Sequence, residues 1–168
     1  MKKILLILLN LIFVTNVYAA NSDLSIDSAN IWITPESPVS SFATTIYARV
    51  KNSGSSDSIG TVTFTSKSTG VKISTDQPVS VLPNGTDDVF ISWTAPYGKQ
   101  DIVVTIIPWD STDNSSNNTA SIAFFVDADP DKDKVGNQQD SDDDNDKCPD
   151  IEDLFPLDAT ECKDSDGD

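Results

Sequence analysis

The acidic residues of this chain are concentrated at one end. Residues 127–168 hold 15 Asp and 2 Glu against four Lys, while the whole chain of 168 residues has a net charge of −16. A segment with so many like charges and so few apolar side chains cannot build a hydrophobic core, and it stays disordered unless cations offset the repulsion. We therefore expect two parts that fold for different reasons: a body, residues 20–126, and an acidic tail, residues 127–168.

The composition excludes several function classes. The chain has no His, which removes the commonest general base and the commonest imidazole metal ligand. The negative charge repels phosphate backbones and anionic lipid, so we expect no nucleic-acid partner and consider cations and basic surfaces the natural ones. No Ser or Thr of the body has a catalytic partner at a usable spacing, so we expect no enzyme.

The N-terminus predicts export. Lys2 and Lys3 precede apolar runs at residues 4–9 and 11–14, and the small residues Val17 and Ala19 follow at positions suited to cleavage after Ala19. This pattern is typical of a secretory signal peptide over residues 1–19, and the apolar run is shorter than the roughly 20 residues of a spanning helix. We expect a secreted or cell-surface protein, in the periplasm or outer membrane if the source is Gram-negative, with no membrane span in the mature chain.

The body shows the period-2 alternation of half-buried β-strands, interrupted by turn-forming clusters. The expected strands cover residues 24–33, 44–51, 61–65, 71–73, 79–82, 88–94, 102–107 and 120–126. Residues 102–107 are apolar on both faces, as in a central strand covered on both sides. Large aromatic residues dominate sandwich interiors, so we place Trp93 and Trp109 in the core and leave Trp32 open. About seven strands in this length predict an all-β, Ig-like antiparallel sandwich.

Several turn motifs of the body resemble a known family. They are Asp23-Leu24 in an opening strand, Thr34-Pro35-x-x-Pro38, Val50-Lys-Asn-Ser-Gly54, Trp93-Thr-Ala-Pro96, and the Asp/Asn-rich loop from Asp110 to Asn118 before a last strand. Together, over residues 23–126, they resemble the cell-adhesion-related domain found in bacteria (CARDB). The resemblance implies an Ig-like sandwich with an adhesive role.

The carboxylates of the tail follow the alternating spacing of calcium loops. Calcium takes six to eight oxygen ligands, and a wrapping loop supplies side chains at positions 1, 3 and 5, a carbonyl at position 7 and a further ligand near position 12. The first run offers Asp129, Asp131, Asp133, the Val135 carbonyl, Asn137 and Asp140. A second run starts at the shared Asp140 and continues with Asp142, Asp144, Asn145 at the turn and the Asp146 carbonyl. A third consists of Asp164, Asp166 and Asp168.

These runs, together with Cys148-Pro-Asp150, Asp153-Leu-Phe155-Pro-Leu-Asp158 and Glu161-Cys162, resemble thrombospondin type 3 repeats. The resemblance implies a calcium-filled structure with almost no core, in which Asp150 is a further ligand and Phe155 and Leu157 are among the few packing residues. Without calcium we expect a disordered tail. The third run stops within a repeat, so we expect the chain to be the N-terminal part of a longer protein.

Cys148 and Cys162 are the only cysteines. Export favours a disulfide, which closes a loop of about 15 residues and stabilises by about 3 kcal/mol on chain-entropy grounds. The alternatives are two free thiols or a metal pair, although two Cys without His make a poor zinc site.

Three functions follow from these features. The first is a calcium-binding adhesion or scaffold protein with an Ig-like module on a calcium-stiffened stalk, whose partner would be a cell-surface protein or glycan. The second is an accessory region of a downstream enzyme or of an OmpA-like anchoring domain in the outer membrane or cell wall. The third is a carbohydrate-binding module, which needs exposed aromatic residues on one sheet face.

Overall fold

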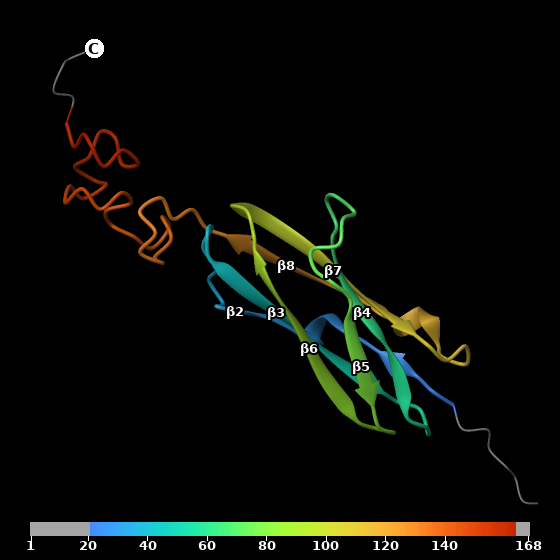
Figure 1. The fold of residues 1–168 in the computed structure, drawn as a ribbon. Coiled ribbons are helices and arrows are strands. Elements are labelled where there is room, and N and C mark those ends of the chain that lie inside the picture. Colours follow the sequence, from blue (N-terminus) through green and yellow to red (C-terminus); the bar gives the residue numbers. More distant parts are fainter. Residues whose placement is uncertain (1–20, 164–168) are drawn as a thin grey trace, which may run out of the picture.

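Two antiparallel four-stranded sheets pack against each other in a computed structural model that describes residues 21–163 (Figure 1). In the first sheet, β3 (Ala43–Asn52) pairs on one side with β1 (Leu24–Ser25) and β2 (Ile31–Thr34) and on the other with β6 (Thr86–Thr94). The second sheet has the order β5 (Gln77–Val81), β4 (Ser58–Ser66), β7 (Gly98–Pro108) and β8 (Thr119–Val126). This is the predicted all-β, Ig-like sandwich.

Two features predicted for the ends of the chain fall outside the part that the structure describes. The predicted signal peptide and the third acidic run, Asp164, Asp166 and Asp168, lie outside the described residues. No helix among residues 21–163 combines the length and apolar character that a bilayer crossing needs. The acidic tail, orange to red in Figure 1, extends from the end of the sandwich at which β8 finishes.

The core lies between the sheets and follows the predicted alternation. Thr44, Ile46, Ala48 and Val50 of β3 are fully buried, and Val62 and Phe64 of β4 are buried from the opposite sheet. Each large apolar side chain buried in this way contributes about 1.5 to 3 kcal/mol. The same cluster contains Leu24, Ile26, Ile31, Val79, Val81, Val89, Ile91, Ile102, Val104 and Ile106.

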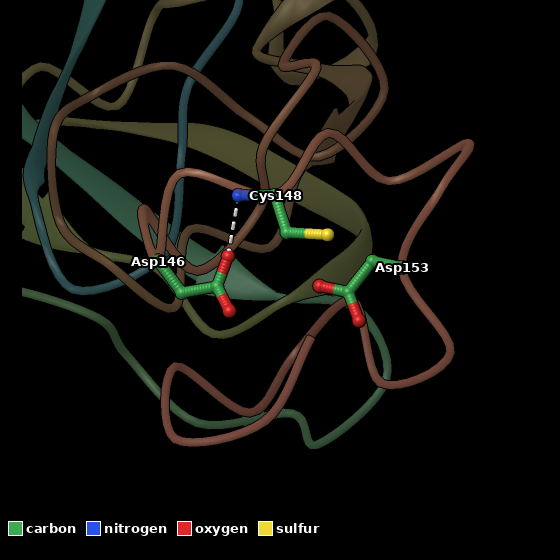
Figure 2. Close-up of side chains that lie close together, drawn as sticks. All are labelled: Asp146, Cys148 and Asp153. Carbon is green, nitrogen blue, oxygen red and sulfur yellow. Dashed lines mark hydrogen bonds between the residues drawn. The ribbon is translucent and has the colours of Figure 1, made fainter. Parts of the chain in front are cut away.

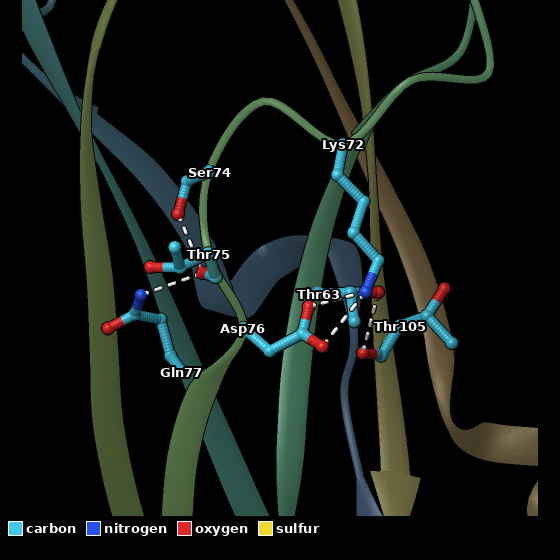
Figure 3. A network of polar contacts seen from close by, with 7 residues as sticks. All are labelled: Thr63, Lys72, Ser74, Thr75, Asp76, Gln77 and Thr105. Carbon is cyan, nitrogen blue, oxygen red and sulfur yellow. Dashed lines mark hydrogen bonds and ion pairs between the residues drawn. The ribbon is translucent and has the colours of Figure 1, made fainter.

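Two expected strands differ from the structure. The first is split by a 3-10 helix, η1 (Ser28–Asn30), because the Asp27 carboxylate accepts a hydrogen bond from Ala29 N–H and caps the turn. Residues 71–73 form no strand, and only an isolated bridge joins Lys72 to Thr65. Instead, Lys72 forms an ion pair with Asp76 at 2.7 Å across the loop that leads into β5 (Figure 3).

The interpretation of residues 102–107 was half right. Strand β7 is central, between β4 and β8, but only one of its faces is buried, because the second sheet has solvent on its outer side. Ile107 is accordingly 48% exposed. Trp93 packs against the core as predicted. The core position of Trp109 was wrong: β7 ends at Pro108, and the tryptophan lies beyond it, 65% exposed.

Candidate metal centre

The tail contains two successive loops of the same construction. We call residues 129–140 loop 1 and residues 142–153 loop 2. Each begins with three Asp residues at alternating positions and ends with a fourth. In loop 1, carboxylate oxygens of Asp129, Asp131 and Asp133 all lie within 4.8 Å of one another. The corresponding oxygens of Asp142, Asp144 and Asp146 in loop 2 do the same.

Local hydrogen bonds explain why these sequences wind into loops. Asp side chains readily accept from backbone N–H groups two residues further on, which replaces helix or sheet pairing by a turn. In loop 2, Asp144 accepts from Asp146 N–H at 3.1 Å, and Asp146 accepts from Cys148 N–H at 2.6 Å. Loop 1 repeats the pattern from Asp131 to Asp133 and from Asp133 to Val135. Each bond uses one carboxylate oxygen, and in Asp131 the second oxygen accepts from the side-chain amide of Asn145.

The turns fall at the same places in both loops. The fourth and sixth positions have positive φ: 67° at Lys132 and 79° at Lys134, then 58° at Asn145 and 82° at Lys147. Glycine would be the unstrained residue here. The sequence-based interpretation gave Asn145 the sixth position of a loop starting at Asp140. In the structure loop 2 starts two residues later, so Asn145 is fourth and Lys147 sixth.

The fourth Asp of each loop lies near the first three. Desolvation raises the pKa of Asp131, a hydrogen bond from Asp133 N–H opposes this, and the charges of Asp129 and Asp140 raise the pKa further. In loop 2, desolvation likewise raises the pKa of Asp144, and the charges of Asp146, Asp153 and Asp142 add to the rise. The structure therefore associates Asp140 with loop 1 and Asp153 with loop 2.

Asp153 was not among the metal ligands expected from the sequence. Its carboxylate and that of Asp146 lie within 4.8 Å of each other on either side of Cys148 (Figure 2). The Cys148 sulfur is no ligand, because it forms the predicted disulfide with Cys162. A thirteen-residue repeat that relates Asp129 to Asp142 and Asp140 to Asp153 could have identified Asp153. It is also the carboxylate of Asp146, and not its carbonyl, that joins the group.

Loop 2 contains buried carboxylate oxygens without hydrogen-bond partners. Asp144 is 8% exposed and Asp153 is 9% exposed, and the Oδ2 atom of each is buried and unpartnered. Oδ1 of Asp142 is in the same state. Burying an ionised carboxylate without a partner costs several kcal/mol. The residues therefore fit a hard cation, which would supply the missing partner for all three oxygens.

A further polar group lies between the two loops. Desolvation raises the pKa of Asp143, with additional contributions from the charges of Asp150, Asp140 and Asp127, while a hydrogen bond with Asn137 lowers it. Asp150 Oδ1 accepts from Asp143 N–H at 2.9 Å. Oδ1 of Asn137 and Oδ1 of Asp143 are buried and unpartnered. The expected ligands Asn137 and Asp150, which have equivalent positions in the two loops, therefore come together at the loop boundary.

The remaining predicted tail residues are more exposed. Val135, at the seventh position of loop 1, is 40% exposed, and its N–H donates to Asp133. The expectation that Phe155 and Leu157 are packing residues was wrong for Leu157, which is 63% exposed, and only partly met by Phe155, which is 40% exposed. The tail is therefore held by its polar groups and the disulfide far more than by apolar contacts.

Loop 1 is attached directly to the sandwich. Asp127 N–H donates to Pro38 carbonyl at 2.9 Å, and Ser40 N–H donates to Asp127 carbonyl at 2.8 Å. The Asp127 side chain accepts from Gln138 N–H at 3.0 Å. A Cβ on Gly136 would lie 2.6 Å from Asp127 Oδ2, so only glycine permits this approach. Asp127 thus connects the end of β8 to loop 1 through its backbone and side-chain contacts.

The comparisons with known proteins concern the sandwich. The sequence matches no protein-family model and no curated protein. A domain from Methanosarcina acetivorans, of a protein proposed to lie at the cell surface, is similar in structure with a TM-score of 0.50 and 23% identity, over 63% of this chain and 92% of that one. This likeness shows the fold.

Two structures of a CARDB domain from Pyrococcus furiosus are also similar. The crystal structure, in complex with di-metal ions, has a TM-score of 0.47 and 19% identity, over 64% of this chain and 94% of that one. The solution structure has a TM-score of 0.48 and 21% identity, over 64% of this chain and 96% of that one. CARDB is the family that residues 23–126 resemble in sequence. The resemblance of the tail to thrombospondin type 3 repeats stays a prediction.

Proposed function

We propose that this protein is a non-enzymatic, calcium-binding protein of the cell surface or the secreted fraction. Its Ig-like sandwich would be carried on a tail that folds around calcium and acts as a stalk. The sandwich would provide adhesion or scaffolding, and calcium would fix its position relative to whatever the stalk is attached to.

The buried, unpartnered Oδ2 atoms of Asp144 and Asp153 carry the calcium assignment. A disordered acidic linker would keep its carboxylates in water, whereas these two are enclosed with Asp142 and Asp146. Three ion pairs involve Arg49, Lys72 and Lys99, and all three belong to the sandwich. A cation from solution is therefore the natural counter-charge for loop 2.

Calcium fits the donor set better than other metals. The ligands are hard carboxylate and amide oxygens, and the two loops are twelve residues long with side chains at positions 1, 3, 5 and 12. Magnesium requires a near-ideal octahedron and retains its waters, and zinc and copper prefer nitrogen or sulfur. The disulfide has already removed both thiols of the chain from the ligand set.

Calcium titration of the chain without its predicted signal peptide, under non-reducing conditions, tests this proposal. Calorimetry should give binding heat at millimolar calcium or below, and residues 127–163 should become resistant to protease. The same titration with magnesium is the control for unspecific charge screening. Absence of heat, together with equal cleavage of the tail in calcium and in chelator, would eliminate the stalk hypothesis.

A carbohydrate-binding role has weaker support. Trp32, Tyr47 and Phe90 do form a row across β2, β3 and β6 on the outer face of the first sheet. However, the Trp32 and Tyr47 rings stack on each other at 5.1 Å with an interplanar angle of 2°, and the Arg49 guanidinium lies 5.5 Å from the Trp32 ring centre. The rings therefore use their faces for one another and for Arg49, which favours a structural role for the row.

A further inference from the structure

Strand β8 forms an open edge of the second sheet. It pairs with β7 along one side, from Thr119 opposite Thr105 to Val126 opposite Gly98. Within residues 21–163 its other side has no strand partner. Backbone bonds beyond its C-terminal end, between Asp127 and the segment Pro38–Ser40, fix the strand in place but leave the eight-residue edge uncovered.

The other edge strands of the described sandwich carry features that oppose pairing with a further strand. Short length, proline and charge are the usual means. Strands β1 and β2 have two and four residues, β5 has five residues and includes Pro78, and β6 includes Asp87 and Asp88. Strand β8, with the sequence Thr-Ala-Ser-Ile-Ala-Phe-Phe-Val, has neither charge nor proline and is the longest edge apart from β6. Among the edge strands that the structure describes, β8 is therefore the least protected.

The free edge borders a shallow apolar groove. A cavity of about 530 Å³ lies between β2 and β8 and is lined by residues 31–34 and 36 on one side and 122–124 on the other. The inward-facing side chains of β8, Ala120, Ile122 and Phe124, are only partly buried against the core. A strand added to β8 would cover them and supply the missing backbone hydrogen bonds.

We propose that two copies of this chain associate through β8, edge to edge and antiparallel, to form one continuous eight-stranded sheet. With Ile122 on the two-fold axis, Ala120 of each copy is opposite Phe124 of the other, and Thr119 is opposite Phe125. Directly opposed residues lie on the same face of an antiparallel pair, so each large ring meets a small side chain.

The charge of the tail selects this orientation. Each copy carries an acidic tail that starts directly after β8. Antiparallel pairing directs the two tails to opposite ends of a strand pair about 24 Å long, which is more than twice the Debye length at physiological salt. Parallel pairing would place the tails side by side, and a strongly acidic foreign strand would meet the same repulsion.

Sedimentation velocity over a wide range of concentrations, with and without calcium, tests the proposal on the chain without its predicted signal peptide. We expect a reversible dimer that Ser121→Lys abolishes, because the two substituted residues are diagonal neighbours about 8 Å apart across the axis and their like charges repel. This variant lowers the net negative charge, so simple charge repulsion would predict stronger association. Ser80→Lys, on the exposed face of β5, adds the same charge at the other edge and should leave the dimer intact.

Cysteine cross-linking tests the register. Ile122→Cys should form an intermolecular disulfide under mild oxidation, because residue 122 faces its own copy. Thr119→Cys should not, since the two sulfurs would be about 20 Å apart. A monomer at every concentration, equal effects of Ser121→Lys and Ser80→Lys, or equal cross-linking of both cysteine variants would each overturn the proposal.

Discussion

Asp129 and Asp142 occupy the same position in consecutive loops of the tail. Each carboxylate accepts a hydrogen bond from the backbone N–H five residues later, at 3.2 Å from Lys134 and at 3.0 Å from Lys147. Both donors have positive φ and thus turn the chain back over the first Asp. The two loops are therefore repeats of one structural unit, and a ligand established for one loop identifies its equivalent in the other.

Replacing Asp153 tests the ligand set that this repeat defines. Asp153→Asn should weaken calcium binding in loop 2 by tenfold or more, about 1.4 kcal/mol or above, because it removes a buried carboxylate from the group around Asp144. Calorimetry should show the loss in one binding event only. The matched control is Glu152→Gln, which removes the same charge from an exposed neighbour. Equal losses in both variants would mean that overall charge, and not ligation, governs the affinity.

The pH dependence of binding follows from the raised pKa of Asp144, which desolvation and its carboxylate neighbours cause. A raised pKa means that the calcium-free loop holds its proton up to a higher pH than an ordinary Asp, whose pKa is about 3.9. Calcium must displace this proton, so affinity should fall as the pH decreases, and the fall should begin above the range of a normal Asp. Titrations in buffers of different ionisation enthalpy should detect the released protons. A calcium affinity that stays constant down to about pH 4 would contradict the raised pKa of Asp144.

The disulfide should matter for the tail and not for the sandwich. Cys148 lies within loop 2, between Asp146 and Asp153, so its bond to Cys162 restricts this loop. Replacing both cysteines with Ser should lower the stability of the calcium-loaded tail by about 3 kcal/mol. Thermal unfolding in calcium should show a less stable tail and an unchanged sandwich. In chelator the variant and the wild type should unfold alike.

The sequence predicts the sandwich well because burial on one face leaves a period-2 pattern. The alternation in β3 and β4 identified Ile46, Val50 and Phe64 as core residues, and all three are buried. The pattern fails where a strand ends. Trp109 is large and apolar, as core residues are, but β7 ends at Pro108. Where the strand ends depends on the tertiary fold, and the residue that follows lies outside the core.

The structure brings together the alternating Asp residues that the sequence singled out, but in a different register for the second loop. Alternating Asp residues predict a calcium loop, and the run from Asp140 to Asp146 fits two starting points. The match with loop 1 decides between them, because positive φ falls at Asn145 and Lys147 as it does thirteen residues earlier at Lys132 and Lys134. Neither Asn145 nor Lys147 is the Gly that would have marked the turn. Burial of Asp153 arises from the fold of the loop and could not be read from local composition.

Asn52 is expected to be a polar anchor of the sandwich. Its buried side chain donates to the carbonyls of Ser56 at 2.8 Å and Val81 at 3.0 Å and accepts from Gly54 N–H at 2.9 Å. Asn52→Ala leaves these backbone groups without partners and should cost about 3 kcal/mol in the free energy of unfolding. Chemical denaturation should show the loss, whereas Ser53→Ala at the exposed neighbouring position should have little effect. A loss below about 1 kcal/mol would mean that water replaces the side chain.

The joint between the sandwich and the stalk should depend on Gly136. Because a Cβ at this position would lie 2.7 Å from the Asp127 Cβ, Gly136→Ala must displace the side chain that accepts from Gln138 N–H. We expect the variant to loosen loop 1 from the end of β8, and small-angle scattering in calcium should show a broader range of molecular dimensions. Gln139→Ala, an exposed residue of the same turn, is the control and should leave the scattering unchanged.

Calcium binding in loop 2 should also persist in Gly136→Ala, because the contacts of Asp144 and Asp153 do not involve Asp127. Loss of binding in both loops would instead indicate that the stalk folds as one cooperative unit with the sandwich.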